Sequence, residues 1–400
     1  MRWLPRALAL GSGSIACVSA LSPTSRSPTT MIAASAASQS PPLFSFGVIA
    51  DVQWADDEDG YNYDRTVSRA YRGAFGNLVR AVDWWNALQQ PPVFIAQLGD
   101  LIDGINVKLG QSAEALEAAL VELRRAPCPV VNIVGNHELY NFDRAALAEA
   151  SWLRHGDAEY YSFKPADGWR MVVLDPYQLA LIGHADDDPR RRESVELIGR
   201  RNPGVDPSGV GGDWFRHVAG YDKRFVPYNG GLGRTQIAWL RSQLAEADAA
   251  GERVCILCHV ILHPRACGGS TMVWDYPEAL DAIAQSSCVA AVLCGHDHFG
   301  QYHFDDVSGV HHCTFCSPLN KGDEGDAFGL VRVWDDTIQI CGPRVDDLLP
   351  ATRGGEPTGR PTKVTRGAEG MESVTLQLRA RTDGCAPGGT ERPAAAAAGA

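Results

Sequence analysis

Five short polar motifs stand directly after apolar runs of the chain, and their residue types are those that hold divalent cations. The candidate metal ligands within them are Asp51, Gln53, Asp100, Asn136, His259, His296 and His298. Carboxylates, amide oxygens and imidazoles bind such metals in proteins. One such motif alone is commonly a turn or a surface histidine. Because all five stand at strand ends, the sequence predicts one metal site.

The elements that must position these residues follow a regular pattern from residue 43 onward. Short β-branched or apolar runs alternate with longer amphipathic ones, as in an α/β domain. The predicted strands cover 44–50, 93–98, 130–134, 171–174, 254–258, 289–294, 310–315 and 329–334. The predicted helices cover 65–88, 113–125, 144–154, 235–249 and 277–285. Ligands gather beyond the carboxyl ends of strands in open α/β sheets, so the five motifs are expected to converge.

The chain is expected to have three parts. Residues 1–42 contain arginines, serines and alanines but no carboxylate, which is typical of an organellar (chloroplast or mitochondrial) transit peptide. A secretory leader and, with Met31 as an alternative start, an untargeted cytoplasmic form remain open. Residues 43–349 form the expected catalytic domain. Residues 350–400 are rich in Gly, Pro, Thr and Ala, so a mostly disordered tail is expected.

Residues 183–228 are rich in Gly, Pro, Asp and Arg, and we expect an irregular excursion over the domain surface there. Long loops of this kind are often functional lids, although a solvated charged loop explains the composition equally well.

Composition excludes several classes of function. The net charge of −12 and the pI near 5.4 argue against a nucleic-acid partner. No stretch approaches about 18 consecutive apolar residues, so no membrane partner is expected. The cysteines fit reduced, buried thiols better than disulfides. Cys313 and Cys316 beside His311 and His312 resemble a zinc site, but alternation along a strand explains this run equally well.

The five motifs together resemble the calcineurin-like metallophosphoesterase superfamily. Its pattern is D-x-H, G-D-x-x-D, G-N-H-[DE], a lone His, and G-H-x-H, and Gln53 stands where it usually has His. That departure resembles the branch of manganese-dependent ADP-ribose/CDP-alcohol diphosphatases, as do Asn229-Gly230-Gly231 and Gly309–His312. The resemblance covers about residues 43–345. It implies an α/β fold, an αββα sandwich of two mixed sheets flanked by helices.

The resemblance also implies how the ligands are shared between two metal ions. Asp51, Gln53, Asp100 and His298 would hold one ion, and Asp100 would bridge to a second held by Asn136, His259 and His296. A metal pair can lower the pKa of water to give an attacking hydroxide and neutralise the phosphoryl group. The oxygen donor of Gln53 favours Mn²⁺, with Mg²⁺, Fe or Zn²⁺ as alternatives.

Two further residues are expected to act on the reaction. His137 would donate a proton to the leaving group or stabilise its charge, and Asp103 would orient His137 or a ligand. His137 could instead merely begin a helix.

The implied substrate is a small nucleoside diphosphate derivative such as ADP-ribose or a CDP-alcohol. Trp54, Tyr140 and Asn229 are the expected substrate-binding residues, since aromatic rings stack on bases. Packing of the helix start explains Tyr140 equally well. A general phosphoesterase and a non-catalytic scaffold are the competing functions. We expect a monomer.

Overall fold

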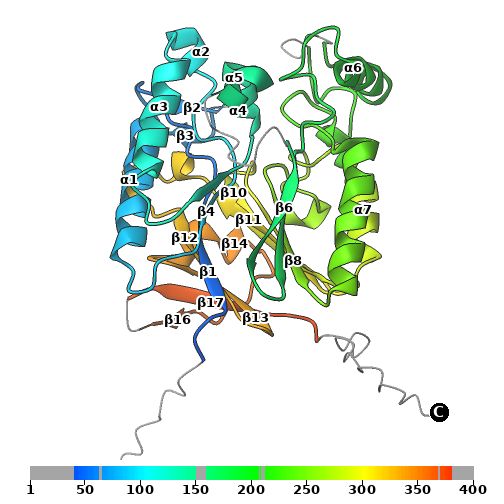
Figure 1. Ribbon diagram of the computed structural model, residues 1–400. Helices are drawn as coiled ribbons and strands as arrows, with labels where there is room; N and C mark the ends of the chain where they lie inside the picture. The colour runs from blue at the N-terminus through cyan, green and yellow to red at the C-terminus, as the bar shows by residue number, and fades with distance from the viewer. Residues whose placement is uncertain are drawn as a thin grey trace, which may run out of the picture. The chain divides into compact units, whose positions relative to one another are not determined.

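The computed structural model describes residues 40–380 apart from 63–64, 150–158, 207, 209–211 and 368–369. The expected targeting segment before residue 40 lies outside this part. Within it, two sheets face each other and helices cover their outer faces (Figure 1). The predicted αββα sandwich of two mixed sheets is therefore confirmed.

The first sheet has seven strands in the order β16-β17-β13-β12-β1-β4-β5. The strands are β1 (Phe44–Ile49), β4 (Ile95–Gln97), β5 (Val130–Asn132), β12 (Phe328–Val333), β13 (Thr337–Gly342), β16 (Thr365–Arg366) and β17 (Glu372–Gln377). β1, β4 and β5 run parallel, whereas β12, β13, β17 and β16 add antiparallel strands on the other side of β1.

The second sheet has six strands in the order β10-β11-β9-β8-β7-β6. The strands are β6 (Tyr161–Ala166), β7 (Trp169–Val173), β8 (Arg253–Cys258), β9 (Val289–Cys294), β10 (Phe299–Asp305) and β11 (Val310–Cys316). β7, β8, β9 and β11 are parallel, and β6 and β10 form antiparallel edges.

Helices and small hairpins complete the described fold. The helices are α1 (Tyr71–Ala87), α2 (Asn106–Leu109), α3 (Ser112–Leu123), α4 (Asn136–Asn141), α5 (Arg144–Glu149), α6 (Pro189–Arg201), α7 (Gly233–Ala249), α8 (Tyr276–Ala284) and α9 (Val345–Leu348). The hairpins pair β2 (Gly60–Tyr61) with β3 (Ser68–Arg69), and β14 (Thr352–Arg353) with β15 (Glu356–Pro357).

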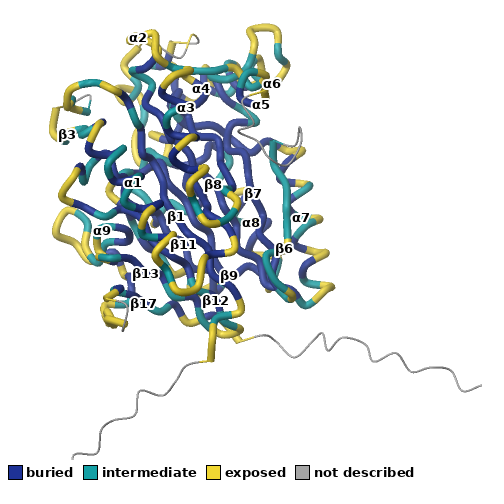
Figure 2. The backbone as a smooth tube through the Cα atoms, turned by 60° about the vertical axis from the view of Figure 1, so that its left-hand side comes forward, coloured by how far each residue is buried: buried dark blue, intermediate teal, exposed yellow. Residues whose placement is uncertain are grey.

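The buried segments lie in the interior of the domain and the exposed ones at its periphery (Figure 2), and the buried side chains form two main clusters. Phe46 of β1, Trp169 of β7 and Leu293 of β9 belong to one buried cluster between the two sheets. The outer cluster includes Leu78 of α1 and Leu240 of α7, which pack against the outer faces. Both faces of the central strands are buried, which explains their continuous apolar sequences.

The expected disordered tail from residue 350 onward is wrong for its described part. β17 pairs along its whole length with β13, and Val374 and Leu376 are fully buried. The alternation of these apolar residues with polar ones is the period of a half-buried strand. Gly- and Pro-rich neighbours conceal this short signal in the sequence. Because β17 belongs to the first sheet, the domain extends beyond the predicted boundary at 349.

The expected irregular excursion at 183–228 is only partly right, because it contains the thirteen-residue helix α6. Asp188 caps this helix by accepting the N–H of Arg190, and Pro189 occupies its first turn. Both are helix-start signals. Only Ser194 and Ile198 of the helix are buried, so its apolar stripe is too short to stand out.

The first predicted helix begins later than expected, at Tyr71 instead of Arg65. The β2–β3 hairpin occupies the intervening residues, and the Asn62 side chain accepts the N–H groups of Thr66 and Val67 in its turn. Among the described residues, no helix combines the length and apolar character that crossing a membrane would need.

Candidate active site

The predicted motifs follow the carboxyl ends of parallel strands from both sheets. Asp51, Asp100 and Asn136 come after β1, β4 and β5 of the first sheet, whereas His259 and His296 come after β8 and β9 of the second. Because the two sheets face each other, both sets of loops reach the same edge of the sandwich. The structure therefore brings together residues that are more than two hundred positions apart in sequence.

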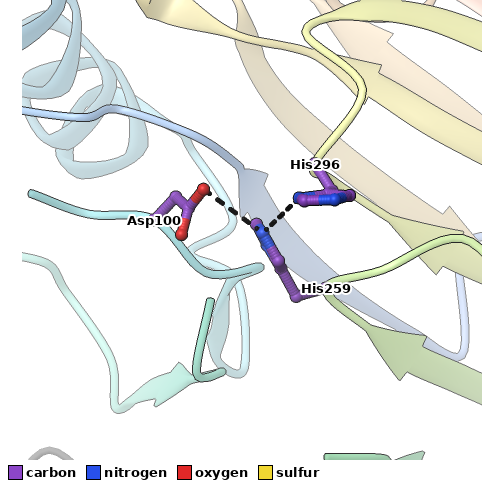
Figure 3. A group of neighbouring side chains, drawn as sticks. All are labelled: Asp100, His259 and His296. Carbon is purple, nitrogen blue, oxygen red and sulfur yellow. Dashed lines mark hydrogen bonds and ion pairs between the residues drawn. The ribbon is translucent and has the colours of Figure 1, made fainter. Parts of the chain in front are cut away.

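Asp100, His259 and His296 form the centre of this site (Figure 3). They are buried, and one potential ligand atom from each lies within 4.8 Å of the others. His259 Nε2 is 3.3 Å from Asp100 Oδ2 and 3.1 Å from His296 Nδ1. Asn136 Oδ1 joins the group at 3.4 Å from His259 Nε2. These are four of the seven predicted ligands.

The other three predicted ligands lie on the opposite side of Asp100. Gln53 Nε2 is 3.2 Å from Asp100 Oδ2 and 2.9 Å from His298 Nε2. His298 Nε2 is in turn 3.6 Å from Asp51 Oδ1. Asp100 thus belongs to both groups, which is the position that a bridging carboxylate requires.

The backbone at this site is strained. Asp51, Gln53, Asp100 and His296 have φ values of 52°, 48°, 57° and 68°, in the left-handed region that residues other than glycine rarely adopt. Each such residue costs about 1–3 kcal/mol and persists only where its surroundings fix it, as at functional sites. Within the described residues, four of the five positive-φ residues other than glycine are predicted ligands, so the strain is concentrated at the candidate site.

Two glycines leave space for the ligands to approach one another. A Cβ atom on Gly135 would lie 2.1 Å from Asp100 Oδ1, and one on Gly295 would lie 2.4 Å from Asp51 Oδ2. Neither glycine has a positive φ, so any residue could adopt their backbone conformation. Room for the carboxylates therefore explains why glycine stands at both positions.

The buried charges strongly perturb one another. Burial raises the pKa of Asp51 well above 3.8, and the nearby Asp100 carboxylate adds to this effect. Burial alone would lower the pKa of His259, but Asp100 and Asp51 outweigh it and raise this pKa to about 9. Burial lowers the pKa of His298 to about 3, helped by the positive charge of Arg69.

These features fit a pair of divalent cations. Oxygen and nitrogen ligands converge, and buried carboxylates crowd together where a cation would relieve their repulsion. Gln53 Oε1 is a buried acceptor for which the described residues supply no donor. A buried oxygen without a donor is costly, and a metal ion would satisfy it.

His137 and Asp103 lie beside the predicted ligands. His137 Nδ1 accepts the backbone N–H of Gly104 at 2.7 Å and is 3.4 Å from Asp103 Oδ2. The Nε2 atom of His137 is 4.0 Å from Asp100 Oδ2. Because Nδ1 accepts a hydrogen bond, the neutral ring carries its proton on Nε2. The backbone of Gly104 was not foreseen as the group that orients His137.

Glu138 ends the third motif, G-N-H-[DE], but the motif does not reveal what its side chain does. Its fully buried carboxylate accepts the N–H groups of Asp100, Leu101 and Gly135 at 2.7–2.9 Å. Burial raises its pKa to about 7, and the Asp100 carboxylate contributes to this shift. Glu138 therefore joins the second and third motif loops. A Glu three residues after a helix N-cap predicts a hydrogen bond to the N-cap N–H of the same helix. It does not predict the bonds to Asp100 and Leu101 in another loop.

Asn229 does not have the expected position for a substrate contact. It is fully buried, its Nδ2 donates to the carbonyl oxygens of Arg224 and Ser270, and its Oδ1 lies 2.8 Å from His296 Nε2. This contact fixes the proton on His296 Nε2 and leaves Nδ1 free to face His259. Asn229 thus orients the predicted ligand His296 through the ring nitrogen that does not face His259.

The two predicted aromatic contacts differ in exposure. Trp54 is half-buried, and its ring packs on Phe75 with the ring centroids 4.5 Å apart. Tyr140 remains 38% exposed and meets the His137 ring edge-on at 5.2 Å. Tyr140 is therefore fractionally the more exposed of the two residues.

Among the described residues, the only cluster of three potential metal ligands is that of Asp100, His259 and His296. The Cys313–Cys316 segment does not form such a cluster. Cys313 lies in the core between the sheets, on the face of β11 that it shares with His311, whereas Cys316 lies on the other face and donates to the carbonyl of Phe299. Strand alternation explains the run. All described cysteines are free thiols.

Comparisons with known proteins agree with this geometry. A family model described as calcineurin-like phosphoesterase matches residues 44–300. A Mus musculus protein named manganese-dependent ADP-ribose/CDP-alcohol diphosphatase is 34% identical over 338 residues, covering 80% of this chain and 96% of that protein. Its namesake from Oryza sativa subsp. japonica is 36% identical over 307 residues, covering 76% and 93%.

A solved structure with the same architecture is a dimetal phosphatase from Danio rerio. It has 30% sequence identity and a TM-score of 0.71, and the match covers 84% of this chain and 100% of that one. With the family model and the relatives, this shows that the chain belongs to the calcineurin-like phosphoesterase family and is a hydrolase.

Proposed function

We propose that this chain hydrolyses the diphosphate bond of ADP-ribose, CDP-alcohols and related nucleoside diphosphate derivatives, with two Mn²⁺ ions as cofactors. The proposal is supported by the names of relatives that match most of its length. It is also supported by the chemistry of the candidate site, where carboxylate, amide and imidazole groups converge.

Gln53 is the observation that carries the proposal. It stands where the wider superfamily pattern has histidine, and it lies between Asp100 and His298 at the centre of the site. An amide oxygen is a harder ligand than an imidazole nitrogen, so this position favours Mn²⁺ or Mg²⁺ over Zn²⁺. The Nε2 atom of Gln53 faces Asp100 and His298, so a half-turn of the amide would bring the unsatisfied Oε1 atom to the cation.

The candidate ligands divide into two sets around Asp100. Asp51, Gln53 and His298 would hold one cation with it, and Asn136, His259 and His296 the other. When bound, the cations supply a water nucleophile at neutral pH and neutralise the charge on the phosphoryl group. Asn229 would keep the proton of His296 on Nε2, so that Nδ1 remains available as a ligand.

His137 would act on the leaving group. Its Nε2–H is the free donor of the ring, because the Gly104 N–H occupies Nδ1. A neutral donor in this position stabilises, through a hydrogen bond, the charge that develops on the departing phosphate oxygen. Transfer of a proton to that oxygen would require the imidazolium form of His137, which becomes neutral on giving up its proton. Asp103, held by the N–H of Ile105 and by Arg69 at 3.5 Å, would stabilise His137 when the ring is charged.

The exposed ring of Tyr140 would contact the nucleoside part of the substrate. The edge-on contact between Tyr140 and His137 supports this role, because His137 is the residue proposed to act on the leaving oxygen. Trp54 would contribute only the part of its indole that Phe75 leaves open.

The proposal is tested with a panel of substrates and metals. ADP-ribose and CDP-choline should be hydrolysed with Mn²⁺ far faster than p-nitrophenyl phosphate, and faster than with Mg²⁺ or Zn²⁺. Preferential hydrolysis of the monoester would favour a general phosphoesterase instead. Stoichiometric metal binding without any hydrolysis would favour a scaffold.

The variant Gln53→His tests the role of the amide directly. It should lower the preference for Mn²⁺ over Zn²⁺ and raise the relative rate on p-nitrophenyl phosphate. Gln90→His makes the same chemical change at an exposed position and should alter neither ratio. Unchanged metal and substrate ratios in Gln53→His would contradict our interpretation of this residue.

We also propose an organellar location and a monomeric state. The location is supported by the absence of carboxylates before Asp51. The location is tested by comparing a fluorescent protein fused to residues 1–42 with a fusion of residues 43–400. Light scattering measures the molar mass and so tests the monomeric state.

A further inference from the structure

The residue between His296 and His298 is held from outside the predicted ligand set. Asp297 is only 4% exposed, and its carboxylate has four partners, one of which is the backbone N–H of Phe299, 3.5 Å from Oδ1. Oδ2 accepts the N–H of Gly268 at 2.7 Å and the hydroxyl of Thr271 at 3.0 Å. Oδ1 pairs with Arg353 Nη2 at 2.9 Å. Asp297 is not one of the clustered potential ligands, and its carboxylate instead binds groups that hold the loop in place.

Arg353 reaches this loop from the C-terminal part of the chain. It lies on β14, beyond residue 300, where the match to the family model ends. Its guanidinium also lies over the ring of Phe299, 5.4 Å from the centroid. Gly268 leaves room for it, since a Cβ atom there would be 2.5 Å from Arg353 Nη2.

The segment that Asp297 anchors is strained and needs such support. His296 has a φ of 68°, and a strained conformation persists only where neighbouring groups hold it. Gly268, Thr271 and Phe299 supply only neutral donors to this buried carboxylate. The cation of Arg353 offsets the charge, because one buried ion without its partner is strongly destabilising.

We infer that Arg353 is a positioning residue, which acts through Asp297 to hold His296 and His298 in the geometry that binds Mn²⁺. Because His296 and His298 belong to different ligand sets, loosening this segment weakens both metal positions. The inference rests on the proposed function, since it takes these histidines as ligands.

The test is direct binding of Mn²⁺ to the metal-free full-length protein, measured by calorimetry and by electron paramagnetic resonance without substrate. Arg353→Ala should raise the dissociation constant for Mn²⁺ about 10- to 100-fold, the usual cost of losing a partner behind metal ligands. At saturating Mn²⁺, kcat should stay within about threefold of the original, because the ligands themselves remain. Arg353→Lys should recover part of the affinity.

Arg360→Ala is the matched control. Arg360 belongs to the same C-terminal segment and is buried in an ion pair with Asp346 at 2.6 Å. Its removal should lower the melting temperature but leave Mn²⁺ affinity unchanged. If Arg360→Ala weakens Mn²⁺ binding as much as Arg353→Ala does, general loosening of the segment is responsible and the inference is wrong.

Gly268→Ala gives a second perturbation that retains every charge. Its added methyl group should displace the guanidinium from Asp297 and weaken Mn²⁺ binding in the same direction. Mn²⁺ affinities within twofold of the original in both Arg353→Ala and Gly268→Ala overturn the inference while the proposed function stands. If the unaltered protein neither binds Mn²⁺ nor hydrolyses ADP-ribose, the proposed function itself fails.

Discussion

Gly135→Ala should disable the site through a steric clash and not through an unfavourable φ or ψ at the substituted residue. Gly135 has a φ of −104° and a ψ of 177°, an extended conformation that alanine adopts freely. The obstacle is space, because the new Cβ would lie 2.1 Å from Asp100 Oδ1 and 2.6 Å from Asp100 N. Ordinary contact begins near 3.4 Å, so the two loops must separate by more than 1 Å.

That displacement sets the expected loss of activity. A misplacement of about 1 Å can cost about 10²-fold in rate, equivalent to about 2.7 kcal/mol in the activation free energy. Asp100 Oδ1 also accepts the N–H of His137 at 2.8 Å, so the same shift moves the proposed proton donor. We therefore expect kcat for ADP-ribose with saturating Mn²⁺ to fall by at least about 10²-fold.

Gly199→Ala supplies a control with the same chemical change. Gly199 lies in α6, and no atom lies within 4 Å of the added Cβ. Alanine should stabilise this helix by about 0.5–1 kcal/mol and leave turnover unchanged. Turnover of Gly135→Ala within threefold of the original, with circular dichroism showing a folded protein, would refute the steric reasoning.

Two further predictions concern His137 in the candidate site and Asp175, which is not a predicted metal ligand. His137→Ala should retain Mn²⁺ affinity but lose about 10²–10⁴-fold in turnover, and a loss of Mn²⁺ binding would instead make His137 a structural residue. For Asp175, burial would raise the pKa, but Arg144 at 2.8 Å outweighs burial and lowers it below 3.8. The ion pair therefore stabilises the fold above that pH, and its contribution disappears as the pH falls through the folded-state pKa. Asp175→Asn should flatten the acid side of the melting temperature–pH curve, and curves that stay parallel below about pH 4 would exclude this linkage.

The sequence predicts the central strands well because both of their faces are buried. The run of β9 has no polar side chain, those of β1 and β8 have one each (Ser45 and Arg253), and a polar motif follows the end of each strand. Peripheral strands carry a weaker signal. β13 alternates Ile338 and Ile340 with polar residues, and it can be recognised only with β17, which comes thirty positions later and completes its pairing.

The candidate ligands could be predicted from the sequence, but the groups that hold them could not. A ligand motif is local, because a strand end and a glycine deliver the side chain. The supporting contacts join distant segments: Asn229 meets His296 across 67 positions, and Glu138 meets Asp100 across 38. No periodicity links such pairs. The misassignment of Asn229 to the substrate has this cause.

The strained backbone and the crowded carboxylates of the site depend on each other. Asp100 and His296 both have positive φ values, and each has its backbone N–H held by a carboxylate from another loop. Glu138 accepts the N–H of Asp100, and Asp51 accepts that of His296 with both oxygens. These carboxylates enforce the strained geometry but are buried close to a third, on Asp100, so that burial and mutual repulsion disfavour their charged forms. Divalent cations between them would remove that repulsion and keep Asp51 and Glu138 ionised as acceptors. The ions proposed to activate water would then also stabilise the loops that bind them.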